Sequence, residues 1–238
     1  MQLDRVGLSI SGGEILGIAG ISGNGQRELA EVICGLRKLE GGSVLLDGED
    51  ITRCPVEQRR RKGIAYVPED RMGTGLVGAM NSYENVLLRH YDNAEFVRHG
   101  MIRSKPLAAQ TKVLEEQYEI KSAGLQRPVS YMSGGNLQKL LLGRELLGAI
   151  QLIIAAYPAH GVDIGATETI HRALLDERAR GAAILLISED LDELFELSDR
   201  IGVLYSGKLM GVFARKDASY ARLGALMSGV LSAEEPCQ

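Results

Sequence analysis

Cysteine is scarce in this sequence, and the cysteines that occur form no recognisable pattern. Cys34, Cys54 and Cys237 are odd in number and widely spaced, and none belongs to a CxxC pair. Disulfide frameworks and thiolate metal sites need paired, regularly spaced cysteines. The sequence therefore predicts free thiols in a reducing compartment, and no metal-ligand cluster.

An excess of positive charge is also missing. The formal net charge is −4 and the isoelectric point is near 5.7, which argues against nucleic acid as a main partner. The one basic cluster, Arg59–Lys62, comes before a predicted strand. We interpret it as the solvated face of a short polar helix.

No uncharged stretch is long and apolar enough to span a membrane. The longest, Leu146–Val162, is interrupted by Gly148, Gln151 and Pro158, which favours a helix end, a loop and a buried strand. No signal peptide is visible, because charged residues interrupt the first positions and no apolar segment follows them. If the protein serves a membrane, we expect it to lie peripherally on the cytoplasmic face.

What the sequence does contain is an alternation of short apolar strands and helical stretches. Its 238 residues are 45% apolar and 24% charged, which is ordinary globular usage. Strands separated by helices predict an α/β fold with a mostly parallel sheet covered by helices. We expect residues 1–70 and 150–238 to form this core, with a helical insert at 71–149. The other predicted strands lie at 43–46, 152–155, 183–187 and 201–205. Helices are predicted at 106–120, 167–180 and 190–197, and the apolar stripe of the first contains Val113, Leu114 and Tyr118. Asn81 and Glu84 are predicted to cap a further helix.

The segment Gly20–Arg27 carries the glycines of a phosphate-binding loop. In the pattern G-x-x-x-x-G-K-[ST], backbone N–H groups, a lysine and a hydroxyl hold phosphate and Mg²⁺. Here the lysine position is Gln26 and the hydroxyl position is Arg27. An apolar strand at 14–19 precedes the loop, and a helix follows whose apolar face is Leu29, Val32, Ile33 and Leu36. We predict a nucleotide-binding loop, with an ordinary βα turn as the alternative. The candidate nucleotide-binding residues of this loop are Gly20, Ser22, Gly23, Asn24, Gly25, Gln26 and Arg27.

A second anion-binding pattern lies at Tyr131–Lys139. Ser133 can cap a helix that leaves the amides of Gly134 and Gly135 unpaired and facing outward, and such a helix N-terminus favours anions. The segment resembles the LSGGQ-type signature of ATP-binding cassette (ABC) ATPases, in the SGGNxQK form of simple-sugar and nucleoside importers. The resemblance implies that Ser133, Gly134, Gly135, Asn136 and Gln138 contact ATP.

Further ABC landmarks follow the expected order along the chain. Residues 66–71 resemble the Q-loop, with Glu69 where many members have Gln, and residues 160–166 resemble the D-loop, with Asp163. Residues 152–158 resemble the Walker B strand, and residues 186–190 the switch segment. The resemblance implies a P-loop NTPase fold of the ABC-ATPase type over 1–238, with a helical signature subdomain inserted. It also implies that residues from Glu69 to Leu88 receive a helix of a transmembrane permease subunit, with Met72, Met80 and Tyr83 as candidate lining.

The chain lacks the residues with which this family hydrolyses ATP. A working cassette ends Walker B with Asp and Glu, and has His in the switch segment; the matching positions here are Ala156, Tyr157 and Glu189. A carboxylate facing a phosphate is repulsive. The sequence therefore belongs with ATP-hydrolysing translocases, but we predict that its own site, without metal ligands, does not hydrolyse ATP.

The intact signature beside the altered P-loop resembles the second, C-terminal cassette of double-cassette ribose-, galactose- and nucleoside-type importers. That resemblance implies that the chain is half of a longer one, and that its partner is the N-terminal cassette. Its signature would then close on ATP and Mg²⁺ held by the partner. A catalytically dead regulatory cassette, or a soluble ABC protein acting on ribosomes or DNA, is the alternative. The transported solute is not specified by these residues.

Overall fold

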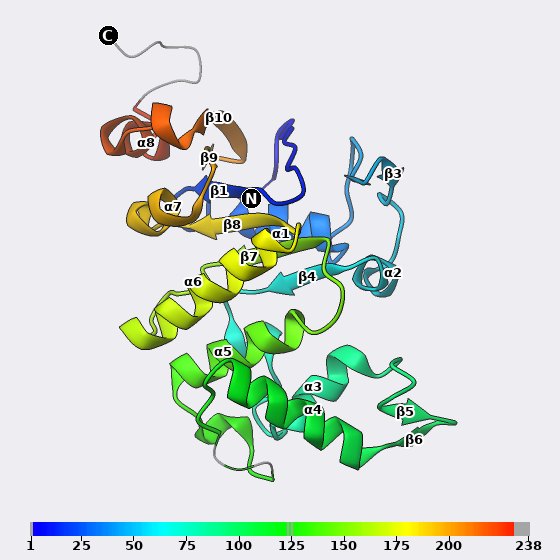
Figure 1. The fold of residues 1–238 in the computed structure, drawn as a ribbon. Helices are drawn as coiled ribbons and strands as arrows, with labels where there is room; N and C mark the ends of the chain where they lie inside the picture. Colours follow the sequence, from blue (N-terminus) through cyan, green and yellow to red (C-terminus); the bar gives the residue numbers. More distant parts are fainter. Residues whose placement is uncertain (1, 123, 125, 231–238) are drawn as a thin grey trace. The chain divides into compact units, whose positions relative to one another are not determined.

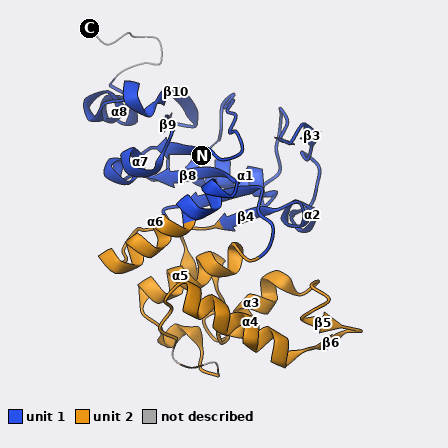
Figure 2. Ribbon diagram, viewed as in Figure 1, with its two compact units in different colours: residues 1–66, 148–157, 174–238 blue, residues 67–147, 158–173 orange. Residues whose placement is uncertain are grey.

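The computed structural model describes residues 2–122, 124 and 126–230 (Figure 1); Cys237 lies outside them. The chain divides into two compact units (Figure 2). The first comprises residues 1–66, 148–157 and 174–238, and the second comprises residues 67–147 and 158–173.

The first unit is built on a six-stranded sheet with strand order β10-β9-β1-β8-β7-β4. β1 pairs in parallel with β8 and β9, β7 pairs in parallel with β8, and β10 pairs antiparallel with β9. The predicted mostly parallel sheet is therefore confirmed. The antiparallel strand β10 is an addition that the sequence pattern did not indicate. The strands are β1 (Ile15–Ala19), β4 (Ile64–Val67), β7 (Leu152–Ala156), β8 (Ala183–Ser188), β9 (Arg200–Tyr205) and β10 (Lys208–Ala214).

Helices cover both faces of this sheet. β1 packs against a helix on each face, because successive residues of a strand point to opposite sides of the sheet. Leu16 and Ile18 belong to the buried cluster that contains Leu29 and Ile33 of α1 (Gln26–Cys34). On the other face, a Cβ built on Gly17 would lie 2.8 Å from a methyl carbon of Leu194 in α7 (Leu191–Leu197). A glycine at this position lets α7 approach the sheet closely. The remaining elements of this unit are β2 (Leu45–Leu46), β3 (Glu49–Asp50), α2 (Val56–Arg61), η3 (Arg215–Asp217) and α8 (Tyr220–Met227).

The second unit is helical, with α3 packed against α4 and α5. Asn81 and Glu84 form the predicted capping box at the start of α3, each side chain bonding the other residue's backbone N–H. The elements are η1 (Arg71–Gly75), α3 (Ser82–His90), β5 (Val97–Arg98), β6 (Met101–Ile102), α4 (Ser104–Gln117), η2 (Val129–Tyr131) and α5 (Gly134–Glu145). α6 (Ile164–Ala179) begins in this unit and ends in the first.

Three local predictions are wrong. Leu36 is 52% exposed because α1 ends before it, at the left-handed Gly35, and Val113 is 54% exposed on α4. Arg59 is 3% exposed and does not lie on a solvated face. Its guanidinium donates to the carbonyl oxygens of Val32 and Ile33, both at 2.7 Å. A cation is stabilised at a helix C-terminus, here that of α1, because the last carbonyls lack helical partners.

Candidate functional site

The glycine-rich loop connects β1 to α1, at the carboxyl end of a parallel strand where α/β proteins bind ligands. Gly25 has φ 112°, in the left-handed region, and a Cβ there would lie 2.9 Å from a methyl carbon of Leu3. Gly23 also has a positive φ, 92°. The loop therefore keeps a backbone that only glycine adopts readily at these two positions.

The side chain of Gln26 fills the interior of this loop. It is 2% exposed, its Nε2 donates to the carbonyl oxygen of Ile21 at 3.0 Å, and its Oε1 accepts from the backbone N–H of Asn24 at 3.1 Å. A Cβ built on Gly20 would lie only 2.3 Å from Nε2. The carboxamide thus occupies space inside the loop and engages one of the amides that a phosphate oxygen would need.

Asn24 bonds both to the loop itself and to the turn between β9 and β10. Its Nδ2 donates to the Ile21 carbonyl at 3.0 Å. Its Oδ1 accepts from the backbone N–H of Ser206 at 2.8 Å, and its carbonyl accepts from Gly207 at 2.9 Å. The loop is therefore anchored to the β9–β10 turn by Asn24.

The side chain of Arg27 forms an ion pair on the surface of α1. Its Nε donates to Glu31 at 2.7 Å, and Arg37 binds the other oxygen of the same carboxylate. Although partial burial raises the pKa of Glu31, the hydrogen bonds from Arg27 and Arg37 outweigh it and leave that pKa lowered. Arg27 therefore already has an anionic partner, one helical turn away from the loop.

The other candidate positions lie at the end of β7 and in the segment after β8. Ala156 and Tyr157 are 4% and 7% exposed and belong to the core cluster that includes Leu16 and Ile18. Tyr157 has φ 51°, and its backbone N–H donates to the Ile187 carbonyl at 2.8 Å. Glu189 is exposed, one residue before Asp190, whose carboxylate caps α7.

In the second unit, Ser133 caps α5, as the sequence predicts. Its Oγ accepts from the backbone N–H of Asn136 at 3.5 Å and from the Asn136 Nδ2 at 2.8 Å. Asn136 Oδ1 in turn accepts from the backbone N–H of Lys121 at 2.8 Å. The cap is therefore tied to the segment that follows α4.

The five signature residues differ in exposure. Ser133 and Gly134 are exposed, whereas Gly135 and Gln138 are buried. The expectation that both glycines face outward is thus wrong for Gly135, because the D-loop segment covers it. A Cβ on Gly135 would lie 2.9 Å from Asp163 Oδ2 and 3.0 Å from the Ala166 Cβ.

The two remaining candidates lie at the ends of other segments of this unit. Asp163 Oδ1 accepts from the backbone N–H of Ala166 at 3.0 Å and so caps the start of α6. Glu69 is exposed and precedes Asp70, whose carboxylate caps η1. The structure brings Asp163 against the signature glycine Gly135, whereas no hydrogen bond links Glu69 to the signature among the described residues.

The sequence model of the ABC transporter family matches residues 3–158. A glucose import ATP-binding protein of Haloferax volcanii is 39% identical over 229 residues, which are 95% of this chain and 42% of that protein. This chain belongs to the ABC transporter family. A guanosine import ATP-binding protein of Bacillus subtilis is 36% identical, over 93% of this chain and 44% of its own length. The chain thus spans less than half the length of these curated relatives.

Solved ABC cassettes share the fold. The dimeric post-hydrolysis structure of the cassette MJ0796, bound to ADP and Pi, superposes with a TM-score of 0.77 over 90% of each chain, at 21% identity. Another structure, of an ATP-binding subunit of an ABC transporter, gives a TM-score of 0.76 over 95% of this chain and 92% of that one, at 20% identity. The predicted ABC-ATPase fold is confirmed. Within the described ranges, no helix combines the length and apolar character needed to cross a bilayer.

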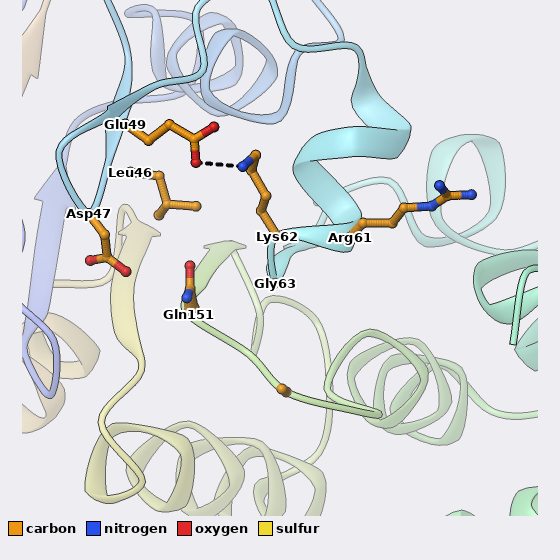
Figure 3. Close-up of a pocket in the computed structure, with 8 residues that line it drawn as sticks. Leu46, Asp47, Glu49, Arg61, Lys62, Gly63 and Gln151 are labelled. Carbon is orange, nitrogen blue, oxygen red and sulfur yellow. Dashed lines mark hydrogen bonds and ion pairs between the residues drawn. The ribbon is translucent and has the colours of Figure 1, made fainter.

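One pocket of this ABC cassette is lined by residues outside the glycine-rich loop (Figure 3). Its lining includes Gly63 and Gln151, which precede β4 and β7. β1 and β7 both run parallel to β8. The amino end of β7 therefore lies at one end of the strands, and the carboxyl end of β1, where the glycine-rich loop begins, lies at the other. Lys62 Nζ, also at the pocket, is paired with Glu49 at 2.5 Å. We therefore assign no phosphate-binding role to this pocket.

Sequence reasoning missed Arg71, which stands beside the signature. Its Nε donates to Gln138 Oε1 at 2.7 Å, and its Nη2 donates to the carbonyl oxygen of His160. These partners are 67 and 89 residues away in the sequence. A local sequence pattern therefore does not indicate the contact. The available signal was the position of Arg71 at the end of the Q-loop segment, residues 66–71.

Proposed function

We propose that this chain is an ATP-binding cassette of an importer for simple sugars or nucleosides, and that its signature serves ATP bound by a partner cassette. Its own P-loop site does not turn ATP over. The whole chain, residues 1–238, acts as one nucleotide-binding domain, an α/β core with an inserted helical subdomain, although residues 158–173, which the sequence places in the core, belong to the second compact unit. The single observation that carries the asymmetry is the buried Gln26 carboxamide inside the loop.

Gln26 supports this proposal in two ways. A lysine would give phosphate a charge-assisted hydrogen bond, worth roughly 1.5–3 kcal/mol, which a carboxamide cannot give. The carboxamide also accepts from the Asn24 N–H, so nucleotide binding would require that bond to break. Some first-turn amides of α1 remain available for an anion, since a helix N-terminus leaves them without helical partners. Weak binding with little magnesium dependence is therefore expected at this site.

The catalytic positions support the same conclusion. Ala156 offers no oxygen to Mg²⁺, and Tyr157 is packed in the core instead of reaching a water molecule. Loss of a general base alone removes about 10²–10⁴ in rate. Glu189 would place a negative charge where the family uses histidine to contact the γ-phosphate, and like charges repel.

The signature segment retains what an anion-binding helix end needs. Ser133 is exposed and caps α5, and Gly134 is exposed at its first position. In ABC pairs, which meet head to tail, such a segment faces the γ-phosphate of ATP held by the other cassette. Ser133, Gly134 and Asn136 would therefore complete the partner's site, Gly135 and Gln138 would support them from inside the unit, and Asp163 would carry communication across the interface. The partner is the N-terminal cassette of a longer chain in this proposal.

The names of the relatives support the importer class. They include import ATP-binding proteins for glucose, nucleosides, guanosine and ribose. We therefore assign simple sugars or nucleosides as the solute class, transmembrane permease subunits as further partners, and the cytoplasmic face of the membrane as the location. A regulatory cassette that never meets ATP is the principal competing function.

The stoichiometry of trapped nucleotide tests this proposal. The transporter containing this chain and its partner cassette is incubated with Mg²⁺, radiolabelled ATP and orthovanadate, which traps ADP only at a site that has hydrolysed ATP. The proposal predicts one trapped nucleotide per pair of cassettes, at the partner's P-loop. Two trapped nucleotides per pair would refute the asymmetry.

A further inference from the structure

Arg71 joins the signature helix to the D-loop segment within the second unit. One hydrogen bond reaches Gln138, in the second turn of α5, and the other reaches the carbonyl oxygen of His160, three residues before Asp163. Gln138 is 1% exposed, so this end of the bridge is fixed inside the unit. The side chain therefore links two segments that sequence places far apart.

The same guanidinium also contacts the first residue of α5. A Cβ built on Gly134 would lie 3.2 Å from Arg71 Nη1. The next residue, Gly135, packs against Asp163, whose Oδ2 would lie 2.9 Å from a Cβ at that position. The two signature glycines are thus held by Arg71 and by the D-loop carboxylate, respectively.

Local electrostatics do not explain why a cation stands here. A positive charge near a helix N-terminus is unfavourable, and within residues 2–122, 124 and 126–230 Arg71 has no ion-pair partner. Burial lowers the pKa of the Arg71 guanidinium, although an arginine remains protonated in proteins. The geometry of the side chain does explain it, because the planar, rigid guanidinium group of arginine can donate to two oxygens that lie in different directions.

We infer that Arg71 is a positioning residue for the signature: its fork holds α5 against the D-loop segment and so sets the geometry of Ser133, Gly134 and Gly135. This inference rests on the proposed function, because the consequence appears only when the signature closes on nucleotide held by the partner. Arg71 need not contact that nucleotide. Its effect is on the step in which the two cassettes close.

The test compares Arg71→Lys and Arg71→Gln in the transporter that contains this chain and its partner cassette. Lysine keeps the charge but cannot span both oxygens, so both variants should lose function. Because ATP first binds the partner's P-loop, we expect kcat to fall about tenfold with KM changed by less than about twofold. Arg172→Gln, an exposed arginine of the same unit, is the matched control and should keep the full rate.

Two further measurements separate positioning from misfolding and from failure of the proposed function. In the chain alone, both Arg71 variants should remain cooperatively folded with a modest loss of stability, because the buried Gln138 Oε1 loses its donor. The amide of Leu137, which donates to the Ser133 carbonyl at 2.9 Å, should exchange hydrogen faster than in the parent. Ser133→Arg should abolish turnover if the signature serves ATP at all. Loss with Ser133→Arg but an unchanged rate with Arg71→Lys would overturn the role of Arg71 and leave the proposed function standing. An unchanged rate with Ser133→Arg would overturn the proposed function, and the role of Arg71 with it.

Discussion

The carboxamide oxygen of Gln26 accepts a hydrogen bond from the backbone N–H of Asn24 at 3.1 Å, inside the loop of Gly20–Gly25. The same carboxamide donates to the Ile21 carbonyl at 3.0 Å. A side chain that begins at the first residue of α1 therefore replaces, within its own loop, contacts that a bound phosphate would otherwise make.

The chain by itself should show no Mg²⁺-dependent ATP turnover. Gln26, Ala156, Tyr157 and Glu189 together remove the lysine, the metal ligand, the base and the switch histidine. Phosphate release and equilibrium nucleotide binding, each with and without Mg²⁺, measure this directly. Steady turnover with ordinary magnesium dependence, in a preparation free of contaminating ATPases, would contradict it.

Replacing Gln26 by lysine should restore binding but not hydrolysis. The substitution removes the acceptor of the Asn24 N–H and adds a charge, so ATP affinity should rise about 10- to 100-fold. Hydrolysis should stay absent, because Ala156 and Tyr157 still provide neither metal ligand nor base, and such groups act as a unit. Gln26→Glu is the control of equal size and should bind ATP no better than the parent. Turnover by the lysine variant would show that the Walker B positions are not limiting.

Arg59 should be essential for stability although it lies in a run of four basic residues. It donates to four carbonyl oxygens, those of Val32, Ile33, Thr52 and Cys54. Arg59→Met removes the donor from all four carbonyls, of which that of Val32 keeps the Gly35 N–H at 3.1 Å as a second donor, and should cost about 3 kcal/mol or more. Urea denaturation measures the cost, with Arg61→Met as the control, since Arg61 makes an exposed pair with Glu57. Equal stability of the two variants would contradict the assignment.

The permease should contact the segment from Glu69 to Leu88. Met72 is 39% exposed there, whereas Met101, on the β5–β6 hairpin, is 69% exposed and serves as the control. A cysteine at position 72 should crosslink to a cysteine-bearing cytoplasmic helix of the permease, in a chain whose own accessible cysteines are replaced. Crosslinking from position 101 alone would place the permease elsewhere.

The parts of the fold that the sequence predicted are those governed by local rules. Strand, loop and helix around Gly20–Arg27 follow from glycine spacing and apolar periodicity, and the Asn81–Glu84 capping box follows from a four-residue pattern. The parallel sheet follows from the alternation of strands and helices. Each of these rests on residues close together in the chain.

The features that were missed depend on tertiary partners. Arg59 resembles its exposed neighbours until the carbonyls of α1 are placed beside it. Strand β10 pairs only with β9 at the sheet edge, and its side chains are half-buried, which leaves a weak pattern. Arg71 and the burial of Gly135 both require the D-loop segment to be packed against α5.

The central claim is that the signature of this chain, and not its P-loop, supports ATP turnover. The most direct measurement is the ATPase rate per assembled transporter for Gly134→Asp against Gln26→Ala. An aspartate at Gly134 places negative charge where the γ-phosphate of the partner's ATP would approach, so turnover should be abolished. Gln26→Ala should leave the rate within about twofold of the parent, since that site performs no step whose loss could slow turnover. Equal losses in the two variants would mean that both sites work alike, and the asymmetric account would have to be abandoned.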